Sequence, residues 1–336
     1  MNAKVQTDNH LKIAVVGPGA IGCLFAGLLV KAGHKVTLLD HRPARARILS
    51  RKGITIQTAD GARVVRVPAT ANASKIGVVD IVFMCVKAYD TAAAISRAAS
   101  AVGPRTIVVS MQNGLGNAEA IARVVDSQQI VCGITGHGVI CLGHGRVFHA
   151  GAGRTRVAAL LPGCRHVAKR VAEVLRDAGL DTTVTEDVNG MLWSKLIVNA
   201  AINPLTVILD IPNGQLLNHP VAHSTMLKAA AEATAVAEAN GVSLLFRDSK
   251  HEVEAICRKT GDNVSSMLQD VRRRHRTEID SITGAIVRAA RKTRLAVPVN
   301  RMLLRQVRII ENCSQKQAAP TIKSRVVAIK SHSEAL

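Results

Sequence analysis

A glycine-rich turn between two short apolar runs constrains the fold of this chain more than any other feature. Residues 12–16 form an apolar run typical of a buried strand, and residues 17–22 follow as Gly-Pro-Gly-Ala-Ile-Gly. Residues 23–33 read as a helix with a glycine at its end, and residues 34–40 return as a second strand that ends at Asp40. A G-x-G-x-x-G turn between a strand and a helix, with an acidic residue about 20 positions on, is typical of a dinucleotide-binding βαβ unit. The sequence therefore predicts an N-terminal α/β Rossmann-like domain with a parallel sheet.

Each glycine of this turn has a separate physical task. Gly17 permits the tight turn, Gly19 lets a pyrophosphate approach the backbone, and Gly22 lets the helix pack closely on the strand. The helix N-terminus then presents free N–H groups and a partial positive charge to the diphosphate. The residues predicted to bind the cofactor here are Gly17, Pro18, Gly19, Ala20, Ile21 and Gly22.

The residues after the second strand leave the choice of dinucleotide open. Asp40 could bond the ribose hydroxyls, which favours NAD(H). Arg42, with Arg45 and Arg47 close behind, suits the 2′-phosphate of NADP(H), because a guanidinium pairs with phosphate oxygens bidentately. Asp40 would repel that phosphate unless it turned away to pair with an arginine.

Two further strands are expected at residues 80–86 and 106–110, each followed by polar residues. Ligands of open α/β sheets bind outside the carboxyl ends of the strands. Lys87 and Asn113 therefore lie where a cofactor or substrate is expected. The plain alternatives are a surface lysine and an Asn-Gly turn.

The length and composition indicate a globular protein with more than one domain. At 336 residues the chain is longer than one core of ordinary size needs. We expect a dinucleotide-binding Rossmann-like domain over residues 1–185 and an all-α substrate and catalytic domain over residues 186–320. Residues 321–336 are expected to form a C-terminal tail.

Charge and cysteine usage bear on partners and location. The formal net charge of +20 is spread along the chain, and aromatic residues make up only 2%, which disfavours base-stacking nucleic-acid modules. Seven cysteines show no regular spacing, as expected in a reducing compartment. The polar N-terminus resembles no signal peptide, and no apolar stretch is long enough to span a bilayer. We expect a cytoplasmic protein with no metal site and no membrane contact.

The second half of the chain changes to helical patterns. One or two β segments are expected within residues 133–153, then helices at residues 167–178 and through residues 193–203, with Pro204 restricting the residue before it. Lys195, Asn199 and Asn203 recur every fourth residue, so they share one face of the last of these helices. A buried lysine there can have its pKa lowered and serve as a proton donor. A lysine that reaches solvent, with two amides bonded to the backbone, is the alternative.

Two long helices are expected at residues 223–240 and 263–293. On the second, Ser266 and Glu278 would be about 18 Å apart if the helix is straight, and closer if it is broken. By itself Glu278 reads most simply as a solvated carboxylate among arginines.

Five motifs together resemble those of the ketopantoate reductase (2-dehydropantoate 2-reductase) family over nearly the whole chain. The first, shared by many dehydrogenases, is the glycine turn, and the last two are specific. They are GPGAIG at 17–22, CVKAYDT at 85–91, MQNGLGN at 111–117, WSKLIVNAAINPLT at 193–206 and NVSSMLQDVRRRHRTEID at 263–280.

The resemblance implies a two-domain reductase that uses NADPH to convert ketopantoate, a small anionic 2-oxo acid, to pantoate on the route to pantothenate and coenzyme A. It implies that Lys195 protonates the ketone oxygen and that Glu278 engages the substrate hydroxyl and orients the lysine. It places Lys87 and Asn113 beside the nucleotide and the nicotinamide. The substrate cage that it implies consists of Asn113, Asn199, Asn203, Asn263 and Ser266.

Some alternatives stay open. Family members that bind NADPH commonly place arginine directly after the second strand, where this chain has Asp40, His41 and Arg42. A 3-hydroxyacid dehydrogenase of the 6-phosphogluconate type also carries a lysine and an asparagine four residues apart on a helix. A cofactor-binding protein without catalytic activity that contacts nucleic acid is the alternative from another class. Homodimerisation is a further expectation.

Overall fold

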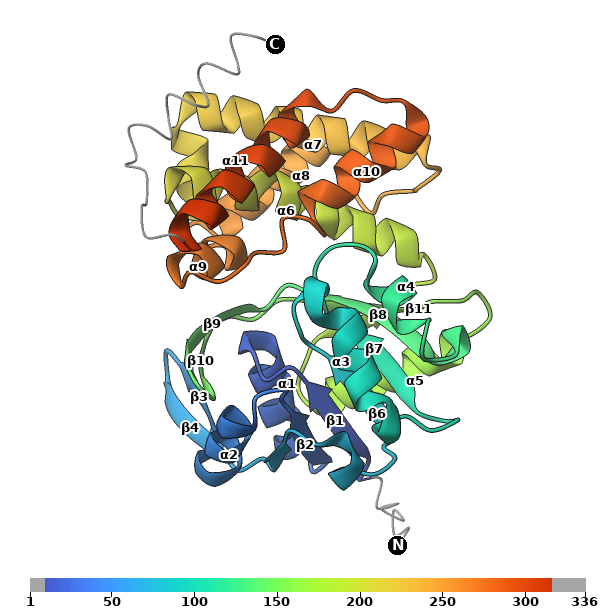
Figure 1. Ribbon diagram of the computed structural model, residues 1–336. Helices are drawn as coiled ribbons and strands as arrows, with labels where there is room; N and C mark the ends of the chain where they lie inside the picture. The colour runs from blue at the N-terminus through green and yellow to red at the C-terminus, as the bar shows by residue number, and fades with distance from the viewer. Residues whose placement is uncertain (1–9, 316–336) are drawn as a thin grey trace, which may run out of the picture. The chain divides into compact units, whose positions relative to one another are not determined.

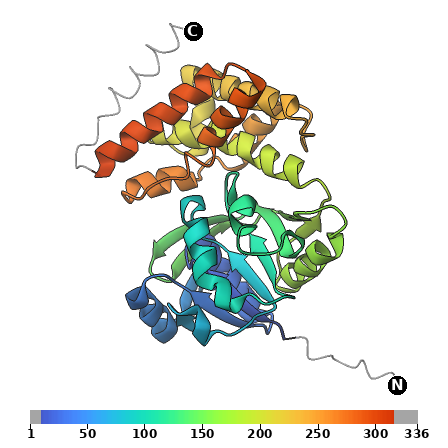
Figure 2. The same ribbon diagram turned by 45° about the vertical axis from the view of Figure 1, so that its right-hand side comes forward.

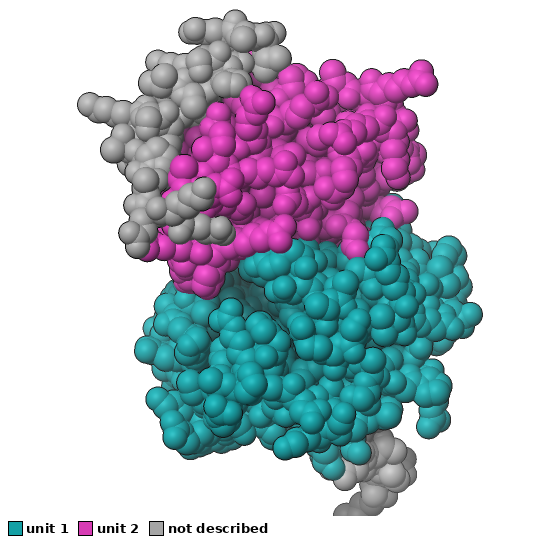
Figure 3. All heavy atoms as spheres, viewed as in Figure 1, with its two compact units in different colours: residues 1–112, 117–188 teal, residues 113–116, 189–336 magenta. Residues whose placement is uncertain are grey.

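A computed structural model describes residues 10–315 of the chain (Figures 1 and 2). These residues divide into two compact units, coloured separately in Figure 3. The α/β unit comprises residues 10–112 and 117–188, and the helical unit comprises residues 113–116 and 189–315. The short segment 113–116 thus belongs to the helical unit although it follows a strand of the α/β unit. The tail expected at residues 321–336 lies outside the described residues.

An eight-stranded, mostly parallel sheet forms the centre of the α/β unit. Its strand order is β12-β11-β8-β7-β6-β1-β2-β5, and among these neighbours β8 and β11 pair antiparallel. The order reverses between β1 and β6, and such a switch point is where open α/β sheets bind nucleotides. The predicted Rossmann-like fold is confirmed. The strands are β1 (Lys12–Val16), β2 (Lys35–Leu39), β5 (Ala69–Thr70), β6 (Ile81–Met84), β7 (Ile107–Ser110), β8 (Ile130–Thr135), β11 (Thr155–Ala159) and β12 (Thr182–Val184).

Both faces of this sheet are buried, which explains why its strands are apolar runs without alternation. In β1, Ile13 and Val15 join a core with α1 and α5, whereas Ala14 and Val16 join a core with α3 on the opposite face. The helices of this unit are α1 (Ala20–Lys31), α2 (Pro43–Lys52), α3 (Thr91–Ala98), α4 (Asn117–Ile121) and α5 (Arg165–Asp177). Single 3₁₀ turns occur at η1 (Ala73–Lys75), η2 (Ala88–Asp90), η3 (Ala99–Ala101) and η4 (Ser127–Gln129).

A second, four-stranded sheet in the order β4-β3-β10-β9 packs against α1. A Cβ at Gly27 of α1 would lie 2.5 Å from the side chain of Ile56, so this glycine permits close packing of the helix on β3. One or two β segments were expected within residues 133–153, and the structure has two there, β9 (Gly138–Gly143) and β10 (Arg146–Gly151). The hairpin of β3 (Ile54–Thr58) and β4 (Gly61–Val65) is an addition that the sequence pattern did not indicate.

The helical unit is built around α6 (Val188–Leu209), whose residues are buried on nearly every side. The expectation that no apolar stretch is long enough to span a bilayer is wrong for α6, which is long and apolar enough to cross one. However, 83% of its apolar window is buried inside the protein, as in a core helix. The helix continues past Pro204 to Leu209 instead of ending near Asn203. Its neighbours are η5 (Asn213–Asn218), α7 (Pro220–Ala239), α8 (Ser249–Lys259), α9 (Ser266–Arg272), α10 (Thr283–Thr293) and α11 (Pro298–Gln315).

The single helix expected over residues 263–293 is wrong, because two helices occupy that range. α9 ends at Arg272 and α10 begins at Thr283, so the 18 Å separation of Ser266 and Glu278 along one axis does not apply. Arg274 adopts φ 58°, which breaks the helix, and the N–H of Thr277 donates to the Glu311 carboxylate of α11 over 2.6 Å. The break places Glu278 in an irregular segment between the two helices.

Candidate active site

The glycine turn has the geometry that a bound dinucleotide needs. Gly17 adopts φ +91°, which L side chains rarely adopt, and its N–H donates to the Leu39 carbonyl over 3.0 Å. A Cβ at Gly22 would lie 2.2 Å from the carbonyl oxygen of Gly17, so only glycine lets α1 begin this close to the strand. A Cβ at Gly19 would meet no atom within 4 Å, which means that open space lies over the turn. The tight turn and the open approach have the form that a diphosphate fits.

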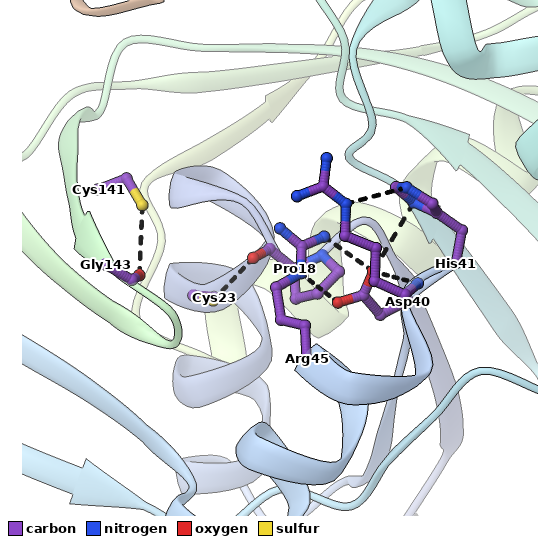
Figure 4. A network of polar contacts seen from close by, with 8 residues as sticks. Pro18, Cys23, Asp40, His41, Arg45, Cys141 and Gly143 are labelled. Carbon is purple, nitrogen blue, oxygen red and sulfur yellow. Dashed lines mark hydrogen bonds and ion pairs between the residues drawn. The ribbon is translucent and has the colours of Figure 1, made fainter. Parts of the chain in front are cut away.

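The start of α1 offers the diphosphate a positive helix end. The helix begins at Ala20 with Gly19 as its N-cap, no side chain caps it, and its first turn contains no acidic residue. Its first N–H groups and dipole are therefore directed at whatever occupies the open space. Pro18 is buried and its carbonyl accepts from the thiol of Cys23 over 3.4 Å (Figure 4). Burial raises the pKa of Cys23 to about 12, so this thiol stays protonated and stabilises the turn.

A hollow that opens to solvent lies at the carboxyl ends of the strands at the switch point, and its empty space is about 310 Å³ with the open solvent included. Its lining includes the ends of three strands. Val16 and Leu39 are the last residues of β1 and β2, Gly17 and His41 come shortly after these strands, and Val86 comes shortly after β6. Arg97 comes from α3. The walls are apolar except for the imidazole and the guanidinium, which suits an adenosine with a negative group. Its full lining is Val16, Gly17, Leu39, His41, Ala71, Val86, Ala94 and Arg97.

Asp40, at the end of β2, is engaged by the residues that follow it (Figure 4). Its side chain is fully buried. Nη2 of Arg45 donates to Oδ1 over 2.8 Å, Nε of Arg45 donates to Oδ2, and the Arg42 N–H donates to Oδ1 over 3.0 Å. Oδ1 also lies 3.7 Å from Nδ1 of the exposed His41. The Arg42 side chain is exposed, and its Nε donates to Nε2 of His41 over 3.3 Å.

Lys87 follows β6 and is half-buried, at the start of η2. A buried amide holds this region: Nε2 of Gln112 donates to the Val86 carbonyl over 2.9 Å and to Oγ1 of Thr91 over 2.7 Å. The Thr91 hydroxyl lies 2.9 Å from Oδ1 of Asn117. The sequence pattern did not single out these supporting residues, although Gln112 and Asn117 stand inside the MQNGLGN motif.

In the helical unit, Lys195, Asn199 and Asn203 lie along α6 as predicted. Lys195 and Asn199 are half-buried, and Asn203 is buried. Burial lowers the pKa of Lys195 to about 8, although the nearby negative charge of Glu278 acts in the opposite direction. A lysine with this pKa is mostly protonated at neutral pH and gives up its proton far more readily than an exposed lysine.

Glu278 is buried, with an exposed fraction of 5%, so its reading as a solvated carboxylate is wrong. Its Oε2 accepts from Nδ2 of Asn113 over 3.2 Å, which joins two residues that are 165 positions apart. The N–H of Leu115 donates to the Ser281 carbonyl over 3.0 Å, and a Cβ at Gly114 would lie 2.5 Å from that oxygen. Segment 113–116 is therefore fastened to the turn that carries Glu278.

The remaining predicted substrate residues lie at the start of α9. Asn263 is half-buried, and Ser266 is the exposed first residue of the helix. Its neighbour Ser265 caps α9 by accepting from the Leu268 N–H, and it lies 2.7 Å from Oγ1 of Thr206. This buried hydroxyl pair connects the start of α9 to α6 one turn after Asn203.

The helical unit thus brings together Lys195, Glu278 and Asn113, with the other amides on the same helix or at the start of α9. The predicted residues of the glycine turn, with Arg42 and Lys87, are in the α/β unit. The residues that sequence reasoning missed are of a supporting kind. They are Thr91, Arg97, Gln112, Asn117, Thr206 and Ser265.

Comparisons with known proteins agree over both units of the chain. The family model described as Ketopantoate reductase PanE/ApbA matches residues 13–162, and its C-terminal counterpart matches residues 187–311. A 2-dehydropantoate 2-reductase from Halobacterium salinarum is 35% identical over 302 residues, which are 90% of this chain and 99% of the relative. Another from Vibrio cholerae is 33% identical over 309 residues, covering 91% of this chain and 100% of the relative.

Solved structures give the same result for the fold. A PanE/ApbA family ketopantoate reductase from Ralstonia eutropha JMP134 superposes with a TM-score of 0.82 at 32% identity, covering 90% of this chain and 99% of that one. A D-mandelate dehydrogenase solved with NADH and anilino(oxo)acetate superposes with a TM-score of 0.85 at 26% identity, with the same coverage.

Proposed function

The chain belongs to the ketopantoate reductase family, and on this premise we propose that it reduces 2-dehydropantoate to pantoate with NADPH. The observation that carries the proposal is the pairing of Lys195, with its pKa lowered to about 8, and the buried carboxylate of Glu278. Both residues stand in the motifs specific to the family.

The proton is the part of the reaction that this chain supplies. When bound, the dinucleotide supplies a hydride to the carbonyl carbon of the substrate. The ammonium of Lys195 donates a proton to the ketone oxygen, where negative charge develops during the transfer. A cation held at that oxygen stabilises the transition state more than the ground state. A pKa of about 8 still leaves Lys195 mostly charged at neutral pH, and its lowering from the ordinary lysine value makes the proton easier to release.

Glu278 and the amides have positioning and binding tasks in this proposal. The Glu278 carboxylate accepts a hydrogen bond from the substrate hydroxyl and holds the lysine ammonium in place. Asn113 fixes the carboxylate through its 3.2 Å contact. Hydrogen-bond donors from Asn199, Asn203, Asn263 and Ser266 bind the substrate carboxylate and hydroxyl. These four side chains are neutral. In this proposal the positive charge that stabilises the reacting oxygen is therefore that of Lys195.

NADPH is the proposed cofactor because the acidic residue at the ribose position is already engaged. Asp40 pairs with Arg45, while exposed His41 and Arg42 carry the nitrogen atoms that a 2′-phosphate needs. Lys87, at the end of β6, adds a further cation on the nucleotide side. The turn from Gly17 to Gly22 receives the diphosphate.

A cytoplasmic location completes the proposal. All seven cysteines lie in the described part of the chain and are free thiols. Free thiols without disulfides are typical of proteins in a reducing compartment.

A panel of substrates tests the proposed reaction. Purified full-length protein with NADPH is given ketopantoate, phenylglyoxylate and 2-oxoisovalerate, and kcat/KM is measured for each from the loss of NADPH absorbance. We expect ketopantoate to have the highest kcat/KM. A higher kcat/KM for another 2-oxo acid would show that ketopantoate is not the preferred substrate. If the protein only oxidised 3-hydroxy acids, its reaction would be that of a 3-hydroxyacid dehydrogenase of the 6-phosphogluconate type.

A further inference from the structure

The side chain of Asp40 is held by Arg45 (Figure 4), and Asp40 is not among the residues that line the nucleotide hollow. An acidic residue at the end of the second strand ordinarily bonds the ribose hydroxyls of NAD(H). Here the side chain is fully buried, and Arg45 donates to both of its oxygens from Nε and Nη2. The Arg42 N–H also donates to Oδ1. Both carboxylate oxygens of Asp40 therefore already accept hydrogen bonds within the protein.

The backbone on both sides keeps this arrangement in place. The Asp40 N–H donates to the Thr70 carbonyl of β5 over 3.0 Å. Arg45 lies in the first turn of α2, which begins with Pro43, so the guanidinium reaches back to the strand end from a fixed helix. A bidentate pair of this kind fixes orientation as well as charge.

What remains at the hollow is positive or neutral. His41 and Arg97 line it. His41 comes shortly after β2, whereas Arg97 lies on α3, which follows β6, the neighbour of β1 on the side away from β2. Both side chains are exposed. With the Asp40 charge cancelled, a dianionic phosphate on the ribose meets the Arg97 guanidinium and the His41 imidazole, and no carboxylate is among the lining residues. With Arg45 removed, the same phosphate would meet an uncompensated carboxylate.

We infer that Arg45 sets the choice of dinucleotide by sequestering Asp40, and that Arg97 contacts the 2′-phosphate. The inference rests on the proposed function only in taking the hollow as the adenosine site. Arg45 is a positioning residue in this scheme, because it acts on the nucleotide through Asp40. Arg97 is a binding residue, and it is absent from the motifs that indicate the family.

Calorimetric titration with 2′,5′-ADP and with 5′-ADP tests the inference without any turnover. The first nucleotide carries the 2′-phosphate and the second does not, so the ratio of their Kd values reports on that group alone. We expect wild-type protein to bind 2′,5′-ADP more tightly. In Arg45→Met the preference should fall about tenfold or more, which corresponds to 1.4 kcal/mol, with 5′-ADP bound at least as well as before. Arg97→Met should weaken 2′,5′-ADP and leave 5′-ADP within about twofold.

Two further variants separate positioning from structural effects. Arg51→Met removes the same charge from the last turn of the same helix, where the side chain is exposed, and should leave the preference unchanged. A tenfold fall there would assign the effect to general charge and overturn the inference. The double variant Arg45→Met with Asp40→Asn removes the freed carboxylate and should restore the preference for 2′,5′-ADP. It also guards against misfolding of the single variant, since an unpaired buried charge is itself destabilising.

Three further results would overturn the inference. They are equal weakening of both nucleotides by Arg45→Met, no recovery in the double variant, and a wild-type preference for 5′-ADP. Failure of the proposed function would look different, because absence of ketopantoate turnover leaves these nucleotide Kd ratios unaffected.

Discussion

Replacing Glu278 by glutamine should move the alkaline limit of activity to lower pH. The pKa of Lys195 is lowered to about 8 by burial, and the negative charge of Glu278 is what opposes that shift. Glutamine keeps the size of the side chain and removes the charge. An opposite charge within ~4–6 Å commonly shifts a pKa by about 1–3 units, so we expect the pKa of Lys195 to fall by at least about one unit.

The direction of the expected pH shift follows from the protonation state of Lys195 that reacts. Lys195 donates a proton, so activity is present below its pKa and is lost as pH rises through it. The wild-type kcat/KM should decline above pH about 8, and that of Glu278→Gln should decline from about pH 7 or below. The assay is kcat/KM for ketopantoate and NADPH from pH 5.5 to 10, because this parameter reports the free enzyme.

Asp280→Asn is the matched control. It removes a carboxylate two residues from Glu278 whose pKa is lowered by its contacts with Arg308 and Arg276. It should leave the alkaline limit where it is in the wild type. The reasoning would be refuted by a Glu278→Gln limit that stays near 8 or rises, because Lys195 would then not be the group that titrates, or Glu278 would not be its counter-charge.

Three more substitutions test separate parts of the site. Lys195→Ala should lower turnover by about 100-fold or more with the Kd of NADPH unchanged by calorimetry; unchanged turnover would remove the proposed proton donor. Gly22→Ala should abolish measurable 2′,5′-ADP binding in the same instrument, because its Cβ would lie 2.2 Å from the Gly17 oxygen, and normal binding would contradict the tight turn. Gly114→Ala should lower the free energy of unfolding by more than the ~1–2 kcal/mol of left-handed strain, because Gly114 has φ +82° and its Cβ would also lie 2.5 Å from the Ser281 carbonyl oxygen. It should also lower turnover by displacing Asn113, and a denaturant curve and kcat equal to those of the wild type would contradict the role of that segment.

The features that could be predicted from the sequence are those whose conformation depends on residues close to them in the chain. The glycine turn is recognisable because its task depends on neighbouring residues: Gly17 needs a positive φ and Gly22 meets the oxygen of Gly17. The polar face of α6 is likewise readable, since helical spacing alone places Lys195, Asn199 and Asn203 together. Both features were predicted in the right elements.

The parts that escaped prediction depend on contacts across long sequence distances. The arginine-rich segment from 272 to 276 is compatible with a helix, and its interruption is accompanied by the hydrogen bond from Thr277 to Glu311, 34 residues away. The burial of Glu278 and its contact with Asn113 connect residues 165 positions apart. No local pattern carries that information.

Pro204 and Asp40 show a second kind of limit. Pro204 lacks the N–H that would complete a turn of helix, yet α6 continues because it is buried among apolar neighbours on nearly every side. Asp40 could be read as a ribose ligand or as the partner of an arginine, and which one holds depends on where the guanidinium of Arg45 points. Tertiary packing decides both cases.

Conversion of ketopantoate by the purified full-length chain tests the central claim most directly. Enzyme, NADPH and ketopantoate are incubated at pH 7, NADPH loss is followed by absorbance, and the product is identified by mass spectrometry. We expect one pantoate for each NADPH oxidised, and a lower kcat/KM when NADH replaces NADPH. NADPH binding without formation of pantoate would contradict the assignment of Lys195 and Glu278 to this reaction.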